Sequence, residues 1–493
     1  MRTAEVARGR RGVGWPVAGA ALAAAIGLAA AADLKIALAV TVALMLAGAI
    51  LLQPSMLLPA LVASVFVEVV SVGGIPISRL LAPVALLVVL GASTRPESRI
   101  RGEGPFVWAT LYAIWALASG LWTVSVGGTT FLLSSLAIGF IYMLAFASLV
   151  TSSRELERVL VAFAAAALAI GVFAIAAFLL GFSKGLVEGR TTGGAGDPNF
   201  FAAYQLVALP LVLVLATEVR KRWLRIALAV TVVVVIGSVL TSVSRGGLLT
   251  LIVIALAMVA LPARTFFGSP RQKRALLVVC VVGGAIAFGA SAGTVVPRLK
   301  ATFAGQSTSA AAQGSGRLEF WSAAWMSTKE RPLLGLGYGA FLEVSDDLIV
   351  RTPGINFQHF DLRPNGSQVH NAYLGSLAEL GIPGLILFLG LLTSTALALR
   401  RTAKRGRAVG ADFIARVANG LLLSLLGWSI ASLFLSSETS RALWIVIGLS
   451  LALPASFRPQ SPRRTASKAG PRSAGCECAP GGRAGACDRA ASS

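Results

Sequence analysis

Long apolar runs, separated by short polar segments, recur along almost the whole chain. Most runs are about 16–25 residues long, and a helix of about 20 residues crosses a bilayer core of ~30 Å. Because the apolar residues are continuous and do not alternate with polar ones, the pattern predicts membrane-spanning helices and excludes a membrane β-barrel. The predicted fold class is therefore all-α, a polytopic membrane protein with about 12–14 transmembrane helices.

The first predicted span follows the basic residues 1–14 and is expected to be retained, because it lacks a clear signal-peptidase site. The segment 79–92 is short and begins at Arg79, so a re-entrant helix is the alternative there. Residues 294–371 form the one long polar loop. The other spans are predicted at 34–52, 56–72, 105–122, 129–150, 156–181, 199–216, 224–243, 247–262, 275–293, 372–398, 413–435 and 441–457.

These patterns divide the chain into four regions. Residues 1–190 are N-terminal transmembrane helices, and residues 191–400 are a core that includes the long loop. Residues 401–457 are C-terminal transmembrane helices. Residues 458–493 are rich in Pro, Ser, Gly, Ala and Arg, a composition typical of a disordered tail.

Composition and charge support a membrane protein and fix its expected orientation. Only 13% of residues are charged, whereas a soluble protein carries roughly a quarter. The net charge of +22 could indicate nucleic-acid binding. However, the basic residues cluster in alternate short segments between spans, as they do in cytoplasmic loops. We therefore predict cytoplasmic termini, a long loop on the outer side, and no nucleic-acid partner.

Arg245 is unusual because it lies in a short turn, residues 242–247, that this orientation places on the outer side, where basic residues are normally avoided. Gly246 and Gly247 follow it and allow a ligand to approach the backbone closely. The alternative is an interfacial arginine whose side chain reaches lipid headgroups. Arg79 and Lys35 occupy comparable outer positions.

Arg317 begins a predicted amphipathic helix within the long loop. We expect its apolar face to pack against the protein or to lie on the membrane surface. A guanidinium at a helix N-terminus suits a phosphate oxygen. Arg245, Arg317 and Arg79 together would neutralise a diphosphate on the outer side. The apolar residues that share one face at helical spacing are Leu318, Trp321, Ala324 and Trp325.

Asp197-Pro198-Asn199 opens the predicted span at 199–216, directly after the glycine-rich residues 191–196. Asp197 as N-cap and Pro198 at the first helical position are typical of a helix start. A glycine-rich outer turn can also shape a binding site, so Asp197 and Asn199 are candidates for that role.

His370 is the candidate catalytic residue, because it stands where the long loop enters a membrane helix. The positive end of the helix dipole disfavours protonation of its ring. A neutral imidazole is what a general base needs at neutral pH. The alternative is a histidine that only makes a hydrogen bond at the interface. His359, the other histidine of the chain, is the second candidate.

We predict neither a metal site nor a cofactor. Asp346-Asp347 is interpreted as a solvated pair. Cys476, Cys478 and Cys487 lack a fourth ligand, and Cys280 lies within a predicted span.

His370-Asn371 is followed, after nine residues, by Gly381-Ile382-Pro383-Gly384. This spacing resembles the H-N-x9-G-x-x-G signature of the O-antigen ligases and related polymerases. Three further segments resemble family segments in the same order, namely Asp197-Pro198-Asn199-Phe200-Phe201-Ala202, Ser244-Arg245-Gly246 and Gly316-Arg317-Leu318-Glu319-Phe320-Trp321.

The resemblance implies a C-type glycosyltransferase membrane fold and transfer of a glycan from undecaprenyl diphosphate to an acceptor on the outer side of the inner membrane. It implies no metal and no nucleotide sugar. His370 would activate the acceptor hydroxyl, and Arg245 and Arg317 would hold the diphosphate. Gly381 and Gly384 would let the helix pack or bend around the lipid, with Asn371 beside the base.

The expected activity is that of a ligase, which attaches a finished glycan to lipid A-core, or of a polymerase, which joins repeat units. The alternative from another class is a polysaccharide-lipid flippase or transporter. A transporter is expected to show internal repeats and ionisable groups near the middle of its spans. Glu68 and Arg416 are the main charges within predicted spans, and no repeat is found. Membrane lipids are the other expected partners.

Overall fold

The computed structural model describes residues 48, 53–72, 74–92, 103–187, 189–303, 317–355 and 366–454. The first predicted span and nearly all of the second lie outside these residues. His359, the three tail cysteines and Lys35 also lie outside them. The predicted tail, residues 458–493, likewise lies outside them.

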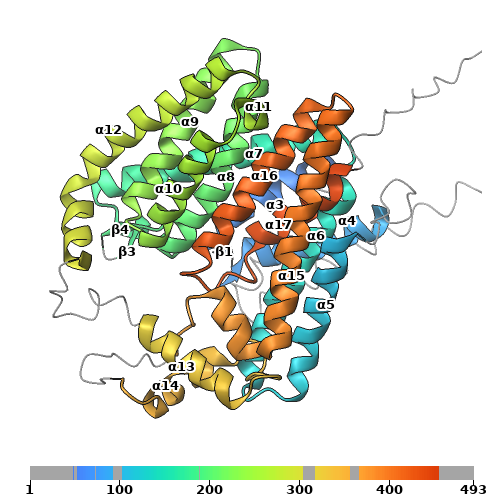
Figure 1. Cartoon of the computed structure of the whole chain (residues 1–493), viewed down its shortest axis with the longest axis vertical. Helices are drawn as coiled ribbons and strands as arrows, with labels where there is room; N and C mark the ends of the chain where they lie inside the picture. Colours follow the sequence, from blue (N-terminus) through green and yellow to red (C-terminus); the bar gives the residue numbers. More distant parts are fainter. Residues whose placement is uncertain are drawn as a thin grey trace, which may run out of the picture. The chain divides into compact units, whose positions relative to one another are not determined.

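The described part is built almost entirely from apolar helices (Figure 1). Seven of them are long and apolar enough to cross a membrane, and four apolar helices are shorter. An all-α, multi-pass membrane protein is therefore confirmed. The seven are α5 (Gly104–Ala118, continued by η3, Ser119–Leu121), α6 (Val126–Leu149), α7 (Ser153–Leu180), α8 (Pro198–Glu218), α9 (Arg222–Thr241), α15 (Ala372–Ala408) and α16 (Asp412–Ala431). The four are α3 (Leu57–Phe66), α4 (Ile77–Ala92), α10 (Arg245–Ala260) and α17 (Arg441–Ala452).

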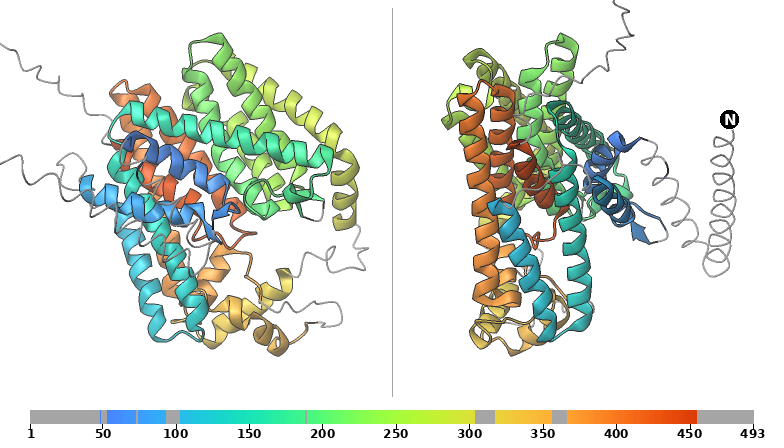
Figure 2. Two further views of the ribbon diagram at one scale, coloured as in Figure 1. Left: turned by 180° about the vertical axis from the view of Figure 1, so that it is seen from behind. Right: turned by 90° about the vertical axis from the view of Figure 1, so that its right-hand side faces the viewer.

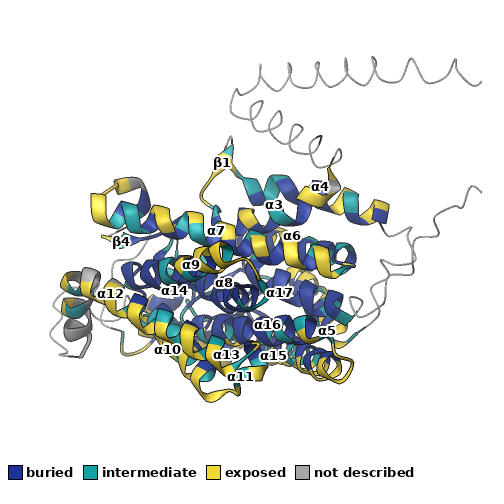
Figure 3. Cartoon of the chain, turned by 90° about the horizontal axis from the view of Figure 1, so that it is seen from above, coloured by how far each residue is buried: buried dark blue, intermediate teal, exposed yellow. Residues whose placement is uncertain are grey.

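Helix α8 lies at the centre of the bundle. It packs against α7, α9, α10 and α16, and nearly all of its side chains are buried. Figure 3 shows α8 as a dark blue helix enclosed by helices with exposed outer faces. A helix that is apolar on every side is expected to be buried in this way. The first residues of α8 are therefore held at the middle of one end of the bundle.

Two hairpins and three short helices connect the longer helices. Two antiparallel two-stranded hairpins consist of β1 (Ser71–Val72) with β2 (Ile75–Pro76), and β3 (Leu186–Val187) with β4 (Arg190–Thr191). The short helices η1 (Pro54–Met56), η4 (Ser183–Gly185) and α11 (Ala263–Phe266) complete the connections. Helix α12 (Pro270–Phe303) continues past residue 293, where the predicted span ends. Helix-favouring residues such as Leu299, Lys300 and Ala301 follow that position and extend the helix beyond the span.

The predicted long loop folds into a cap, which comprises α13 (Arg317–Glu330), α14 (Phe341–Arg351) and residues 366–380. The cap has its own apolar core, which includes Phe320, Phe341 and Val369. The predicted apolar face of α13 is only partly correct. Ala324 is buried, but Leu318 and Trp325 are 63% and 52% exposed, because the cap core packs on the neighbouring Phe320 and Ala323 instead.

Helix α15 contains the span predicted from 372, and it consists of two helical segments that meet at a kink. Gly381 has non-helical dihedral angles, φ 68° and ψ −172°. Residues 372–380 belong to the cap, where Leu336 N donates a hydrogen bond to Ala378 O. Residues 382–408 form the apolar span, and α15 lies alongside α5 and α16. Figure 2 shows α15 and α5 side by side.

The opposite end of the bundle carries the loops that were predicted to be cytoplasmic. There Arg416 Nε donates to Glu218 Oε1 at 2.6 Å. Asn419 Nδ2 donates to Thr265 O at 2.8 Å, which ties α16 to α11. The two ends of the bundle are thus chemically distinct, and the candidate residues lie at the cap end.

Candidate functional site

Three membrane helices begin at the cap end with side-chain caps that the sequence encodes locally. Asp197 Oδ1 accepts from Asn199 N at 2.7 Å and Phe200 N at 3.0 Å, and Pro198 follows as the first residue of α8. This confirms the predicted helix start. Ser244 caps α10 through Gly247 N, and Asn371 caps α15 through Tyr373 N. Helix N-termini carry partial positive charge, so their gathering favours an anion.

Asn199 joins the start of α8 to the turn before α10. Its Oδ1 accepts a hydrogen bond from Ser244 Oγ at 2.7 Å and another from Arg190 Nη2 at 3.1 Å. Arg190 Nε also donates to Ser242 O at 3.1 Å. The structure therefore adds Arg190 to the residues beside Arg245. Arg190 was not among the predicted site residues, although it shares the signal that singled out Arg245, namely a basic residue in a short segment predicted to be outside.

Arg317, at the start of α13, is electrostatically coupled to both of these helix starts. Burial lowers the pKa of its guanidinium, while nearby Asp197 raises this pKa and nearby Arg245 lowers it. Three charges from α13, α8 and α10 thus form one group. The guanidinium stays protonated, because an arginine loses its proton only far above neutral pH.

Phe434, in the loop between α16 and α17 (residues 432–440, the α16–α17 loop), lies between the two arginine-bearing turns. Its ring centroid is 6.0 Å from Arg317 Cζ. A Cβ added to Gly246 would lie only 2.9 Å from Phe434 Cδ2. Gly246 is therefore needed for the close approach of this ring to the residue next to Arg245. No local signal in the sequence indicated Phe434.

His370 is held by the same loop. Its backbone N donates to Ser436 Oγ at 3.0 Å, and Ala372 N donates to Ser432 O at 2.9 Å. His370 has a positive φ of 55°, a conformation that few residues other than glycine adopt. Its ring packs edge-on against Phe320 of α13, with centroids 6.4 Å apart. Phe320 lies one turn after Arg317, so α13 and the α16–α17 loop link the histidine to the arginine group.

Gly381 and Gly384 shape the cap. A Cβ on Gly381 would lie 2.4 Å from Leu333 O, and one on Gly384 would lie 2.1 Å from Leu380 Cβ. Ile382 N donates to Pro332 O at 2.8 Å beside this break. Both glycines therefore let the two segments of α15 and the cap backbone approach closely.

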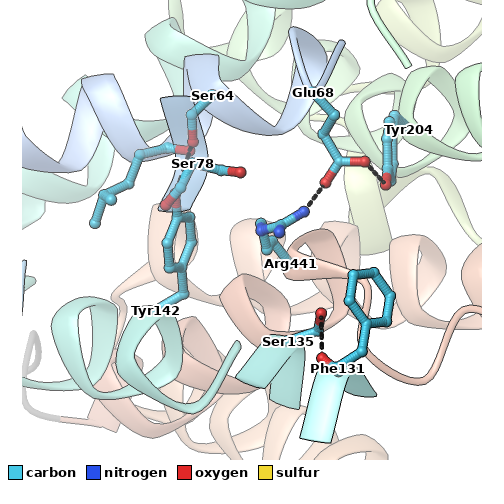
Figure 4. Close-up of polar contacts among 9 residues, drawn as sticks. Ser64, Glu68, Ser78, Phe131, Ser135, Tyr142, Tyr204 and Arg441 are labelled. Atoms are coloured by element: carbon cyan, nitrogen blue, oxygen red, sulfur yellow. Dashed lines mark hydrogen bonds and ion pairs between the residues drawn. The ribbon is translucent and has the colours of Figure 1, made fainter. Parts of the chain in front are cut away.

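Arg79 does not join this group through any contact in the described ranges. Its Cζ lies 5.1 Å from the ring centroid of Phe131, on α6. Another arginine, Arg441 at the start of α17, is paired with Glu68, whose Oε2 accepts from Tyr204 Oη at 2.9 Å (Figure 4). Across the described residues, Arg441, Arg416 and Arg351 make salt bridges with carboxylates, whereas Arg245 and Arg317 do not.

In the part of the chain that the structure describes, no three or more His, Cys, Asp or Glu residues group as a metal site. Asp347 instead forms a salt bridge with Arg351, with Oδ2 3.1 Å from Nε, on the exposed face of α14.

A family model described as O-antigen ligase matches residues 230–389. The matched region contains Arg245, Arg317, His370 and the two signature glycines, and it ends inside α15. Asp197 and Asn199 precede it. No curated protein matches the chain. The match confirms the resemblance that the motifs indicated.

Proposed function

We propose, on the premise that this chain belongs to the O-antigen ligase and polymerase family, that it transfers a glycan from undecaprenyl diphosphate to an acceptor hydroxyl. The reaction would take place at the cap end, on the outer face of the cytoplasmic membrane, with both termini in the cytoplasm. The observation that carries the proposal is the coupling of Arg317 to Arg245 and Asp197 beside His370.

The arginine group is suited to a diphosphate. Arg245 is exposed and Arg317 is partly buried, and neither is neutralised by a salt bridge within the described residues. Guanidinium groups bind phosphate oxygens through paired hydrogen bonds. The starts of α8, α10 and α15 add the positive ends of three helix dipoles. This arrangement would stabilise the negative charge that grows on the diphosphate as it leaves.

His370 would act as the general base. A ring nitrogen takes the proton of the acceptor hydroxyl while the acceptor oxygen forms a bond to the anomeric carbon of the glycan. The bond from that carbon to the diphosphate oxygen breaks, and the diphosphate keeps the electron pair. Such a base contributes about 10²–10⁴-fold to a rate. Phe320 and Ser436 support this role because they position the ring and the backbone of His370.

The acceptor separates the two activities within the family. Lipid A-core would make the enzyme a ligase, and a second lipid-linked repeat unit would make it a polymerase. A flippase would move the lipid without glycosidic bond formation. The described pairs Glu68–Arg441 and Glu218–Arg416 lie towards opposite ends of the bundle, an arrangement unlike a charge relay across the membrane.

The test is transfer in proteoliposomes that contain a polyprenyl-diphosphate-linked glycan and either lipid A-core or a second lipid-linked repeat unit. His370→Ala is expected to lower the initial rate by about 10²–10⁴-fold. His359→Ala, which changes the only other histidine, is the matched control and is expected to retain the rate. Native-like transfer by His370→Ala would refute the base assignment. Movement of labelled lipid across the bilayer without transfer would favour the flippase.

A further inference from the structure

The turn that leads into Arg245 has an unusual backbone conformation. Helix α9 ends at Thr241 and α10 begins at Arg245, so only residues 242–244 join the two helices. Val243 has a positive φ of 48°, which makes it an outlier for a β-branched residue. The residue just after a helix C-cap often adopts such a left-handed conformation, but it is usually glycine. The turn is therefore strained, and neighbouring groups must hold it.

Arg190 holds this turn from the β3–β4 hairpin. Its Nε donates to Ser242 O at 3.1 Å, and Ser242 is the C-cap of α9. The last carbonyl groups of a helix have no partner within the helix and carry partial negative charge, so a guanidinium is a favourable partner for them. The contact therefore acts on the residue directly before Val243.

Asn199 holds the other side of the turn. Its Oδ1 accepts from Arg190 Nη2 at 3.1 Å and from Ser244 Oγ at 2.7 Å. Ser244 is the residue directly after Val243, and its Oγ also accepts from Gly247 N at 3.1 Å in the first turn of α10. Arg190 and Asn199 together therefore fix the residues on both sides of the strained valine.

The β3–β4 hairpin is itself supported by the bundle. Thr191, the residue after Arg190, is fully buried, and its Oγ1 lies 3.1 Å from Thr241 Oγ1 at the end of α9. Thr192 N donates to Gly185 O at 3.0 Å at the base of the hairpin. Strand β4 packs against α7, α8 and α9. The hairpin thus gives the guanidinium of Arg190 a firm base from which to hold the turn.

The geometry favours a positioning role for Arg190 over direct contact with a diphosphate. A guanidinium binds phosphate best through two parallel N–H donors. The Nε and Nη2 donors of Arg190 are directed instead at Ser242 O and Asn199 Oδ1. Arg245 follows the turn and is exposed. Arg190 therefore acts on the backbone that leads into Arg245.

We propose that Arg190 is a positioning residue of the transfer reaction, which holds Val243 in its left-handed conformation and thereby directs Arg245 towards the diphosphate. This role rests on the proposed function, because it requires that Arg245 binds the donor. Without Arg190, Val243 relaxes to a negative φ and the turn shifts. Arg245 then no longer stabilises the leaving group.

The first test asks whether a glycine at position 243 makes Arg190 dispensable in the proteoliposome transfer assay. Arg190→Ala is expected to lower the transfer rate about 10–100-fold, because two hydrogen bonds from a charged donor are lost. Glycine adopts a positive φ without strain, so Val243→Gly is expected to keep at least about half of the native rate. The double variant, Arg190→Ala with Val243→Gly, is expected to lie within about threefold of Val243→Gly alone.

Two further variants separate positioning from charge. Arg190→Lys keeps the charge but loses the planar pair of donors, so its rate is expected to fall as far as that of Arg190→Ala. Arg225 is the matched control, because its Nη2 also donates to a backbone carbonyl, Val219 O at 3.1 Å, at the opposite end of the bundle. Arg225→Ala is expected to keep the native rate. An undiminished effect of Arg190→Ala in the Val243→Gly background, or a native rate with Arg190→Lys, would overturn the proposal in favour of direct contact between this charge and the diphosphate.

The second test needs no substrate and is independent of the proposed function. Hydrogen–deuterium exchange of the full-length protein in lipid nanodiscs reports the amides of residues 240–248, among them Val243 N, which donates to Leu240 O at 3.0 Å. Exchange there is expected to be at least about fivefold faster in Arg190→Ala, while α15 keeps its native exchange because the rest of the bundle is folded. Unchanged exchange in residues 240–248 would overturn the proposal. If the native protein transfers to no acceptor, the proposed function fails, while the exchange measurement still decides whether Arg190 holds the turn.

Discussion

Gly381→Ala tests whether the signature glycine is needed for the fixed kink between the two segments of α15 or acts as a flexible bend. At φ 68° and ψ −172°, the backbone is in a region that is almost exclusive to glycine, and occupying it costs an alanine about 1–3 kcal/mol. The new Cβ would also lie 2.4 Å from Leu333 O and 2.5 Å from Leu333 C. These are backbone atoms, which cannot rotate away, and overpacking of this kind costs about 1–3 kcal/mol.

The two effects together predict that the native cap is destabilised by roughly 2–6 kcal/mol, or at least about thirtyfold in its local equilibrium. Limited proteolysis should cut the cap near residues 331–340 faster in Gly381→Ala, and proteoliposome transfer should fall at least about tenfold. Gly289→Ala is the matched control, because a Cβ there meets nothing within 4 Å. Native transfer and native protease resistance in Gly381→Ala would refute the requirement for glycine at this kink.

Substitutions at three further residues test the arginine group and the caps, the first two in the same transfer assay and the third by thermal unfolding. Arg317→Lys keeps the charge but loses the planar pair of donors, so a fall of about 10–100-fold is expected, and an unchanged rate would remove Arg317 from the diphosphate site. Asn199→Ala removes the oxygen that accepts hydrogen bonds from Arg190 and Ser244. The loss of these bonds is expected to cost about 1–3 kcal/mol and to lower the transfer rate at least fivefold. Native kinetics would show that this link is dispensable. Asn371→Ala removes a helix cap and should cost about 1 kcal/mol of stability, measured by thermal unfolding. Asn371→Asp should cap the helix as well as the native residue does. Equal losses of stability in the two variants would exclude capping as the role of Asn371.

The helix starts of the site were predictable because their causes are local. Asp197 and Pro198 determine the start of α8 locally. The Asp197 side chain accepts hydrogen bonds from the first free backbone N–H groups of the helix, and the ring of Pro198 fixes a helical φ. The apolar spans were predictable for the same reason. Seven described helices are long and apolar enough to cross a bilayer, and runs of that length are visible in the sequence; the number of spans predicted for the whole chain is not tested by them.

The assembly of the site could not be read from the sequence, because it depends on packing between distant segments. Arg245 and Arg317 are coupled only after the cap folds onto the start of α8. Phe434 and Ser436 lie in a serine-rich loop without a distinguishing motif, and their roles depend on what approaches them. Arg79 shows the converse, because its outer position resembled that of Arg245, yet it packs on Phe131.

The distribution of salt bridges distinguishes Arg245 and Arg317 from other arginines of the described bundle. The described bundle neutralises Arg416 with Glu218 at one end and Arg441 with Glu68 beside α8. In the same described residues, Arg245 and Arg317 make no salt bridge. The two arginines are nevertheless close enough that Arg245 lowers the pKa of Arg317. Asp197 offsets part of the repulsion between these two like charges, and a further anion beside the helix N-termini would offset more of it. The diphosphate would remove that repulsion when it binds, and His370 would then stand beside a donor whose leaving group is already stabilised.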